Sequence, residues 1–237
     1  MTVPESNDPA SNDAGSAASG VRAALVDDAT VIRGALSTML PRIDMVGVHP
    51  SVEALLEQRP EVDLVILDLH LVNRTQPGAR QGVEAVRALV SEGYRVCVYS
   101  QEERRWVLAA CFAAGASGAV SKADPVEQAE RVFVDVAGGE VVVPPRVIGL
   151  IEVLVRRRSL TLVSERQRQV LAGRARGLTY AEMSQRMHLS ESTLRGYWHE
   201  LTATVSVHLQ QTAPADIERA LGLAPGDLLE TWPGPAN

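Results

Sequence analysis

The sequence has few aromatic residues, two cysteines and no long apolar run, and each scarcity excludes something. Aromatic residues make up 4% of the 237 positions, so the core must be built mainly from aliphatic side chains. No apolar run approaches the roughly 20 residues that a membrane-spanning helix needs, and the N-terminus lacks a signal-peptide pattern. Cys97 and Cys111 form neither a disulfide framework nor a metal-binding spacing. We therefore expect a protein of the reducing cytoplasm that makes no membrane contact.

Lysine is scarcer still. Lys122 is the only lysine, and all other members of the set of 23 lysines and arginines are arginine. An ammonium group is a compact charge that can meet a single oxygen, whereas a guanidinium is a planar fork. The net charge of -6 argues weakly against nucleic-acid binding. That average hides a basic region in the second half of the chain.

The first half of the chain alternates short apolar strands with helical patterns. Residues 1–20 contain almost nothing to bury and are expected to form a disordered tail. The strands are expected at 21–26, 43–48, 64–67, 94–99 and 117–121, and the helices at 29–40, 51–56, 83–91, 102–114 and 124–137. This alternation predicts an α/β domain over residues 21–138, built on a five-stranded, doubly wound parallel sheet.

Polar side chains follow four of the five expected strands. Asp27 and Asp28 follow the first strand, Asp68 the third, Ser100 the fourth and Lys122 the fifth. Because the carboxyl ends of parallel strands meet at one edge of a sheet, we expect these side chains to converge there. The run 64–67 is continuously apolar, which is typical of a strand buried on both faces.

Three converging carboxylates would repel one another unless a cation lay between them. Hard oxygen ligands with room for water suit Mg²⁺. Beside that metal, a carboxylate such as Asp68 could accept a phosphoryl group, with Lys122 neutralising charge and Ser100 donating a hydrogen bond. The cluster therefore predicts a magnesium-dependent phosphoryl-transfer site.

These residues carry a family resemblance. Residues 21–138 resemble the receiver domain of bacterial response regulators, and the run from Gly115 to Lys122 is close to the usual sequence of that family at this point. The resemblance implies a flavodoxin-like sheet in the order 2-1-3-4-5. It also implies Asp68 as phosphoacceptor, stabilisation of the phosphoryl group by Ser100 and Lys122, and a Mg²⁺ site formed by Asp27 (more remotely), Asp28, Asp68 and the backbone carbonyl of His70.

Two positions depart from that family. Ala119 stands where a tyrosine or phenylalanine usually lies, three residues before the lysine. The aromatic coupling between phosphorylation and the neighbouring face of the sheet is therefore expected to be absent or rerouted. The loop over residues 69–81 is longer than the usual short turn. It borders the site and could alter kinase access or the lifetime of the phosphate.

The second half of the chain is predicted to be helical, and part of it is rich in basic residues. Residues 139–160 are expected to form a linker and linker helix, 161–223 a small helical domain and 224–237 a C-terminal tail. Between Arg156 and Glu200 there are nine arginines and four glutamates, a balance typical of a DNA-binding module. Capped helices are expected at 165–176, 180–187, 191 to about 205, and 214–221.

Residues 160–207 resemble the LuxR-type helix-turn-helix of the NarL/FixJ class of response regulators. Glu182, Leu189, Ser190, Thr193 and Leu194 fall at the scaffold positions of that pattern. In such motifs the N-terminal residues of the second helix enter the major groove. The candidate DNA contacts are Ser192, Thr193, Arg195, Gly196, Tyr197 and His199, and Arg195 is the best contact for phosphate or guanine.

The function expected is a phosphorylation-dependent transcriptional regulator that accepts a phosphoryl group on Asp68 from a partner histidine kinase and binds promoter DNA as a homodimer. An atypical regulator, constitutive or ligand-gated, is an alternative. A Mg²⁺-dependent aspartyl phosphohydrolase fits less well, because such enzymes usually place the nucleophile on the first strand with a second Asp two residues on. Asp27-Asp28 does not provide that spacing. A DNA-binding regulator rather than an enzyme is therefore expected.

Overall fold

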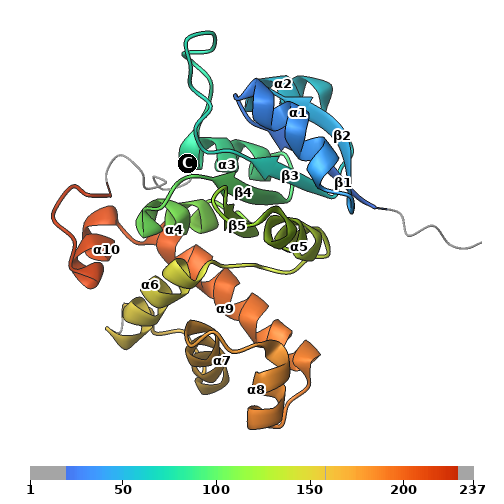
Figure 1. Ribbon diagram of the computed structural model, residues 1–237. Helices are drawn as coiled ribbons and strands as arrows, with labels where there is room; N and C mark the ends of the chain where they lie inside the picture. The colour runs from blue at the N-terminus through green and yellow to red at the C-terminus, as the bar shows by residue number, and fades with distance from the viewer. Residues whose placement is uncertain (1–19, 158, 229–237) are drawn as a thin grey trace, which may run out of the picture.

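The computed structural model describes residues 20–157 and 159–228, which form a parallel β-sheet unit followed by a helical unit (Figure 1). The tail expected over residues 1–19, Arg158, and residues 229–237 lie outside the described residues. Among the described residues, no helix has both the length and the apolar character needed to cross a membrane.

Five parallel strands form the sheet in the order β2-β1-β3-β4-β5, which confirms the predicted doubly wound fold. The chain places β2 on one side of β1 and the later strands on the other, so a crevice opens at the carboxyl ends of β1 and β3. The strands are β1 (Val21–Val26), β2 (Ile43–His49), β3 (Leu64–Leu67), β4 (Val96–Ser100) and β5 (Gly118–Ser121).

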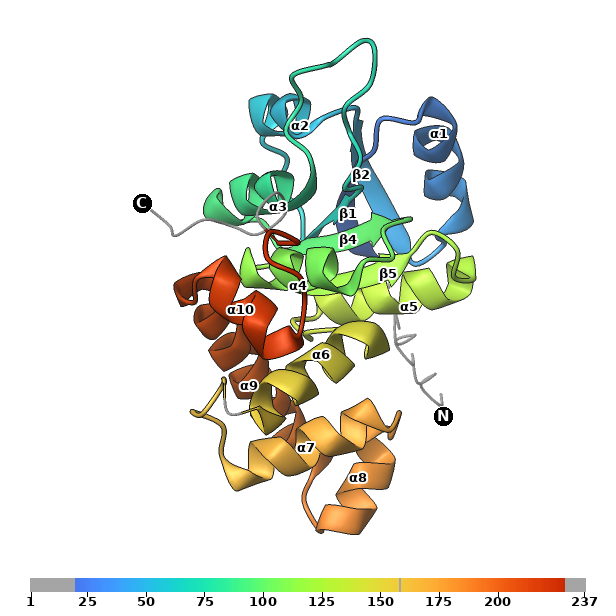
Figure 2. The same ribbon diagram turned by 90° about the vertical axis from the view of Figure 1, so that its left-hand side faces the viewer.

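Helices cover both faces of the sheet (Figure 2). One face is buried under α1 and α5, where Leu36 and Phe133 join the core, and the other under α2, α3 and α4, which contribute Leu55, Val86 and Val107. Both faces of β3 are therefore buried, as its unbroken apolar run predicted. The helices are α1 (Thr30–Met39), α2 (Val52–Gln58), α3 (Gly82–Ser91), α4 (Arg105–Ala113) and α5 (Val126–Ala137).

Five further helices follow the sheet unit. Two of their starts are fixed by reciprocal capping boxes, one between Ser164 and Gln167 and one between Thr179 and Glu182, as the sequence predicted for the second. The helices are α6 (Pro145–Arg156), α7 (Glu165–Ala175), α8 (Tyr180–Met187), α9 (Glu191–Gln211) and α10 (Pro214–Leu221). Helix α6 lies between the sheet unit and α7 in both views (Figures 1 and 2).

Helix α9 is longer than predicted, because its C-terminal half packs on the sheet unit. The pattern predicted an end near residue 205, but the helix continues to Gln211. Ser206 Oγ donates to the carbonyl oxygen of Phe112 at 3.1 Å, and Gln210 Nε2 donates to that of Ala113. These two side chains donate to carbonyl groups in the last turn of α4, where i-to-i−4 helical hydrogen bonds end. Such contacts lie far apart in sequence and are invisible to local periodicity.

The linker extends the sheet at its β5 edge. The backbone N–H of Val142 donates to Ser117 O at 2.9 Å, and the N–H of Ala119 donates to Val142 O at 3.3 Å. The next contact reaches α9, because Trp198 Nε1 donates to Val141 O at 2.9 Å. Trp198 is fully buried. The linker is thus held between the sheet and the long helix.

Residues 224–228, expected in the C-terminal tail, pack against α10. The buried carboxylate of Glu218 accepts hydrogen bonds from the backbone N–H groups of Gly226 and Leu228, at 3.0 and 2.9 Å. Leu228 is completely buried. The packed helical unit therefore extends at least to Leu228.

Candidate functional site

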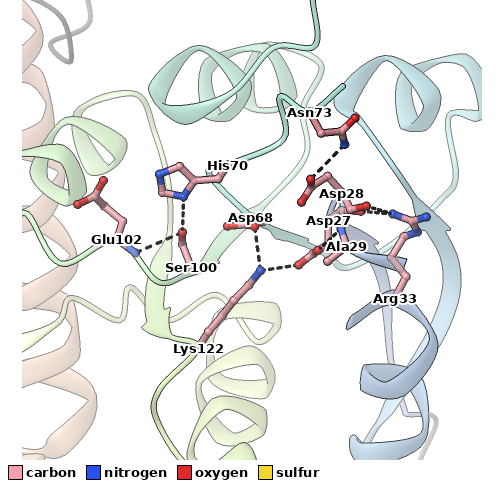
Figure 3. Close-up of polar contacts among 10 residues, drawn as sticks. All are labelled: Asp27, Asp28, Ala29, Arg33, Asp68, His70, Asn73, Ser100, Glu102 and Lys122. Carbon is pink, nitrogen blue, oxygen red and sulfur yellow. Dashed lines mark hydrogen bonds and ion pairs between the residues drawn. The ribbon is translucent and has the colours of Figure 1, made fainter. Parts of the chain in front are cut away.

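The carboxyl edge of the sheet brings two buried aspartates onto the only lysine (Figure 3). Lys122 Nζ lies 2.6 Å from Asp27 Oδ2 and 2.8 Å from Asp68 Oδ2. The three side chains are 12%, 0% and 8% exposed, respectively. Because β1, β3 and β5 end at the same edge, residues 54 and 95 positions from Lys122 meet on one ammonium.

Burial and pairing compete in setting the charge of this cluster. Burial raises the pKa of the Asp27 carboxyl, and the hydrogen bond from Lys122 only partly offsets it. Burial would lower the pKa of Lys122, but its hydrogen bonds to Asp27 and Asp68 outweigh that effect and the pKa is raised. The lysine is therefore held firmly charged, while the site has more negative charge than one ammonium can balance.

Asp28 completes an acidic group that fits a divalent cation. One oxygen from each of Asp27, Asp28 and Asp68 lies within 4.8 Å of the other two. Asp68 Oδ1 is buried and accepts no hydrogen bond from any residue that the structure describes, which is costly unless a cation or donor meets it. Carboxylate oxygens are the ligands that Mg²⁺ prefers, with water filling the remaining positions. The residues therefore fit the predicted metal.

The turn that carries Asp27 and Asp28 is fixed by its own backbone and by α1. Asp27 Oδ1 accepts a hydrogen bond from the backbone N–H of Ala29 at 2.8 Å. Arg33 Nη1 donates to the carbonyl oxygens of Asp27 and Asp28, at 2.6 and 2.8 Å. Both side chains are thereby held at the mouth of the crevice.

Asn73, which the sequence interpretation placed only in the long loop, reaches the acidic group. Its Nδ2 donates to Asp28 Oδ2 at 3.1 Å. Its Oδ1 accepts from the backbone N–H groups of Thr75 and Gln76, at 2.9 and 3.2 Å. Gln76 Nε2 in turn donates to Leu71 O at 2.9 Å. The loop is thus folded on Asn73, an arrangement that the Asn-x-Thr spacing permits but does not specify.

Ser100 and His70 lie at the same edge, on the side of β4. Ser100 is buried, and its Oγ lies 3.5 Å from His70 Nδ1 and accepts weakly from the N–H of Glu102 at 3.4 Å. The side chain of His70 is exposed. The role expected for the backbone carbonyl of His70 stays a prediction.

The six candidate DNA contacts lie on the first turns of α9, and they differ in exposure. Ser192, Thr193, Gly196 and His199 are exposed, and Tyr197 is half-buried. The hydroxyl groups of Ser192 and Thr193 lie 2.9 and 2.8 Å from Ser190 Oγ at the helix N-cap. These positions form an open surface at one end of the helical unit.

Arg195, the best of the six candidates, is turned toward its own chain. Its Nε lies 3.0 Å from Glu140 Oε1 in the linker, and its Nη2 lies 3.2 Å from Glu191 Oε2. The guanidinium also stacks over the ring of Tyr180, 4.7 Å from the ring centre. Arg195 is therefore engaged by the linker, by α9 itself and by Tyr180.

The chain is similar in sequence to two proteins named as transcriptional regulators over most of its length. It is 27% identical to the DNA-binding transcriptional activator DevR/DosR of Mycobacterium tuberculosis over 220 residues, covering 87% of this chain and 99% of that protein. It is also 27% identical to the probable transcriptional regulatory protein SgaR of Hyphomicrobium methylovorum, covering 84% of this chain and 92% of that protein. Both matches extend across the sheet and helical units. No protein-family model matches the chain.

Solved structures similar to this chain include two full-length regulators. The response regulator ChrA of a heme-sensing two-component system has 19% identity and a TM-score of 0.45, covering 85% of this chain and 96% of that one. RcsB, in a structure of two dimers bound to two parallel DNAs, has 16% identity and a TM-score of 0.49, covering 82% and 100%.

Proposed function

We propose that this chain, a response regulator with a receiver sheet and a LuxR-type helical unit, is a DNA-binding transcriptional regulator switched by phosphorylation of Asp68. The observation that carries the proposal is the convergence of Asp27, Asp28 and Asp68 around Lys122 at the carboxyl edge. The end-to-end match to regulators of transcription supports the output. Receiver, linker and DNA-binding domains are assigned to 21–138, 139–160 and 161 onward.

The phosphoryl donor is a phosphohistidine of a partner kinase. A carboxylate oxygen of Asp68 forms a bond to phosphorus while the bond to the donor's imidazole nitrogen breaks. The imidazole keeps the electron pair and takes up a proton from water. Lys122, now held between two carboxylates, turns its ammonium toward the new phosphoryl oxygens, and the Ser100 hydroxyl donates to one of them.

Magnesium held by Asp27, Asp28, Asp68 and the backbone carbonyl of His70 would neutralise charge on the phosphoryl group. Asn73 is a positioning residue for that site, because its amide fixes the orientation of the Asp28 carboxylate. The residues of the site can accept and hold a phosphoryl group, and both relatives are named as regulators of transcription. We therefore assign the chain as a regulator and not as an enzyme.

The route from Asp68 to the DNA-reading surface runs through the linker. Lys122 directly follows β5, β5 pairs with Val142, and the preceding carbonyl of Val141 accepts from Trp198 of α9. A side chain at position 119 is not required for this route. Tyr99 packs edge-on against Phe133 with their ring centres 5.6 Å apart, and its ring centre lies 5.8 Å from Lys122 Nζ.

The reading surface is restrained in the arrangement observed here. Glu140 holds Arg195, and the C-terminal end of α4 holds Ser206 and Gln210. When phosphorylation draws Lys122 away from Asp27, the end of β5 and its paired linker shift, and α9 is released to read DNA as one half of a homodimer.

Phosphorylation is tested with a small-molecule donor. Acetyl phosphate and Mg²⁺ should add the mass of one phosphoryl group to the intact protein, and Asp68→Asn should abolish the addition. Asp63→Asn is the matched control, because Asp63 precedes the same strand at its opposite end and accepts a hydrogen bond from Arg22 N. Equal labelling of Asp68→Asn and the unchanged protein would disprove the assignment of Asp68.

A further inference from the structure

A cavity of about 450 Å³ lies between the two units and borders the phosphoryl site at Ser100. Its walls come from β4, β5 and α5 on the sheet side and from the linker, α6 and α7 on the other. Figure 2 shows α6 lying along this junction. Cavities of roughly 300–1,000 Å³ between packed elements are the usual size and place for small-molecule sites.

The middle of the cavity is apolar. Val98 and Ala119 line it from the sheet, and Val143 and Ile148 line it from the linker and α6. All four side chains are at most 6% exposed. Because position 119 carries only a methyl group, no side chain of the sheet fills the space. Such walls suit the flat apolar body of a small organic molecule.

On the side of the helical unit, the cavity is lined by an arginine with one N–H group that has no hydrogen-bond partner among the described residues. Arg174 lines it from α7, and its Nε is buried without a hydrogen-bond partner among the described residues. Its Nη1 makes only a long hydrogen bond of 3.4 Å to Leu178 O. The guanidinium is held over the rings of Tyr180 and Trp198, at 5.1 and 5.7 Å from their centres. A guanidinium held against two aromatic rings, with one long hydrogen bond, can bind a carboxylate or sulfonate through its terminal N–H groups.

The acidic groups on the cavity wall do not serve Arg174. The carboxylate of Glu102 is bound by Arg104, whose Nη2 lies 2.7 Å away. The carboxylate of Asp124 accepts from the backbone N–H of Ser121 at 3.3 Å. The remaining arginine on the wall, Arg146, donates to Glu103 O at 3.3 Å. Arg174 is therefore the group on the wall that an anionic ligand would satisfy.

We propose that this cavity is a binding site for a small amphipathic anion, with an apolar ring system against Ala119 and Ile148 and an acidic end at Arg174. Such a molecule would touch β5 beside Lys122 and α7 of the DNA-binding unit at once. It would stabilise the arrangement in which the two units enclose the cavity, and thus oppose release of α9. Binding in the cavity is independent of phosphorylation, whereas its effect on α9 rests on the proposed function.

Anilinonaphthalene sulfonate, an aromatic anion that fluoresces in apolar sites, is a suitable probe for the folded full-length protein. We expect saturable binding that Ala119→Phe weakens at least roughly tenfold, because the new ring fills the cavity. Ala203→Phe is the matched control, since Ala203 lines separate grooves on α9 and its replacement should leave the affinity unchanged. Ala119→Leu, a smaller change, provides the same test if the phenylalanine variant fails to fold.

Competition against the probe tests the cation. Naphthoate should displace anilinonaphthalene sulfonate roughly tenfold better than naphthamide of the same shape, because a charged acceptor on Arg174 is worth more than a neutral one. Arg174→Gln should remove that difference. Absence of saturable binding, unchanged affinity in folded Ala119→Phe and Ala119→Leu, or an unchanged preference in Arg174→Gln would overturn the proposal. Labelling of Asp68 by acetyl phosphate is a separate measurement, so the two proposals can fail independently.

Discussion

The carboxyl edge of the sheet and the first turns of α9 were both predicted as functional surfaces, and the structure treats them differently. At the sheet edge, Asp27 and Asp68 are buried and share the ammonium of Lys122. On α9, most candidates are exposed on a single helix, and the main one, Arg195, is paired with Glu140 of the linker. The order of the strands brings the residues of the first surface together. The second surface is restrained by its contact with the linker.

The two regions differ in how strongly their charged groups depend on one another. Buried, desolvated charges at the sheet edge depend strongly on one another, because removing a partner leaves an uncompensated charge inside the protein. The half-exposed ion pairs of Arg195 are worth little individually, so they can be exchanged for contacts with DNA. A strongly coupled site at the sheet edge and weakly held contacts on α9 suit the switch proposed for this chain.

The largest effect is expected from removing the shared cation. Lys122→Met should lower the free energy of unfolding by about 3–5 kcal/mol at neutral pH, because two buried carboxylates lose their partner. Arg156→Met, which breaks an exposed pair with Glu152, should cost less than about 1 kcal/mol. Urea unfolding followed by circular dichroism measures both. Equal losses in the two variants would show that the sheet edge is not the more strongly coupled region.

The next effect concerns the metal and the long loop. Asn73→Ala should weaken Mg²⁺ binding roughly tenfold by calorimetric titration, because the Asp28 carboxylate loses the donor that orients it. Gln76→Ala is the control, since Gln76 anchors the same loop without touching Asp28. If both variants bind Mg²⁺ as the unchanged protein does, Asn73 does not position the site.

Two histidines, the buried His49 in the sheet unit and the half-buried His208 in α9, give the two units different responses to pH. Burial lowers the pKa of His49 and of His208 below the ordinary value of 6.5. A lowered pKa means that the stability associated with the neutral imidazole is present above 6.5 and is lost as pH falls through the folded-state pKa. Both ring nitrogens of His49 lack hydrogen-bond partners among the described residues, whereas those of His208 lie 3.4 Å from Ser159 Oγ and Thr212 Oγ1.

We therefore expect the urea concentration at the unfolding midpoint to decrease as the pH is lowered from about 7 to about 5. His49→Phe should flatten this fall and add about 1 kcal/mol of stability near pH 7, because two unsatisfied buried nitrogens are removed. His208→Phe should flatten it without that gain, since its hydroxyl partners lose their hydrogen bonds. A pH profile that neither variant changes would contradict this assignment.

The smallest effect is expected at the interface between the units. Glu140→Gln should leave stability within about 1 kcal/mol and raise the DNA affinity of the unphosphorylated protein by up to roughly fivefold. Glu191→Gln removes the other partner of Arg195, which lies on α9 itself, and should not have this effect. Fluorescence anisotropy with DNA from upstream of the protein's own gene measures the affinities. The restraint by Glu140 is rejected if the two variants bind DNA equally.

The fold and the convergence at the sheet edge could be predicted because both follow from local patterns. The positions of Asp27, Asp68 and Lys122 at the ends of parallel strands are sufficient to bring them together once the sheet order is known. The helix starts at Thr179 and Ser190 were also predictable, because capping residues act within one turn.

The contacts between distant segments could not be predicted. The pairing of Glu140 with Arg195 and of Asn73 with Asp28 depends on how the linker and the long loop fold back. The extra length of α9 reflects its packing on α4, since its periodicity alone contains no signal for that partner. The cavity beside Ala119 likewise needs the positions of both units, although the small residue itself was evident in the sequence.

The most direct test of the switch measures DNA affinity with and without acetyl phosphate and Mg²⁺, in the unchanged protein and in Asp68→Asn. We predict that treatment tightens DNA binding by the unchanged protein and has no effect on Asp68→Asn. If the untreated protein binds DNA as tightly as the treated protein, or if Asp68→Asn responds equally, phosphorylation of Asp68 does not control α9.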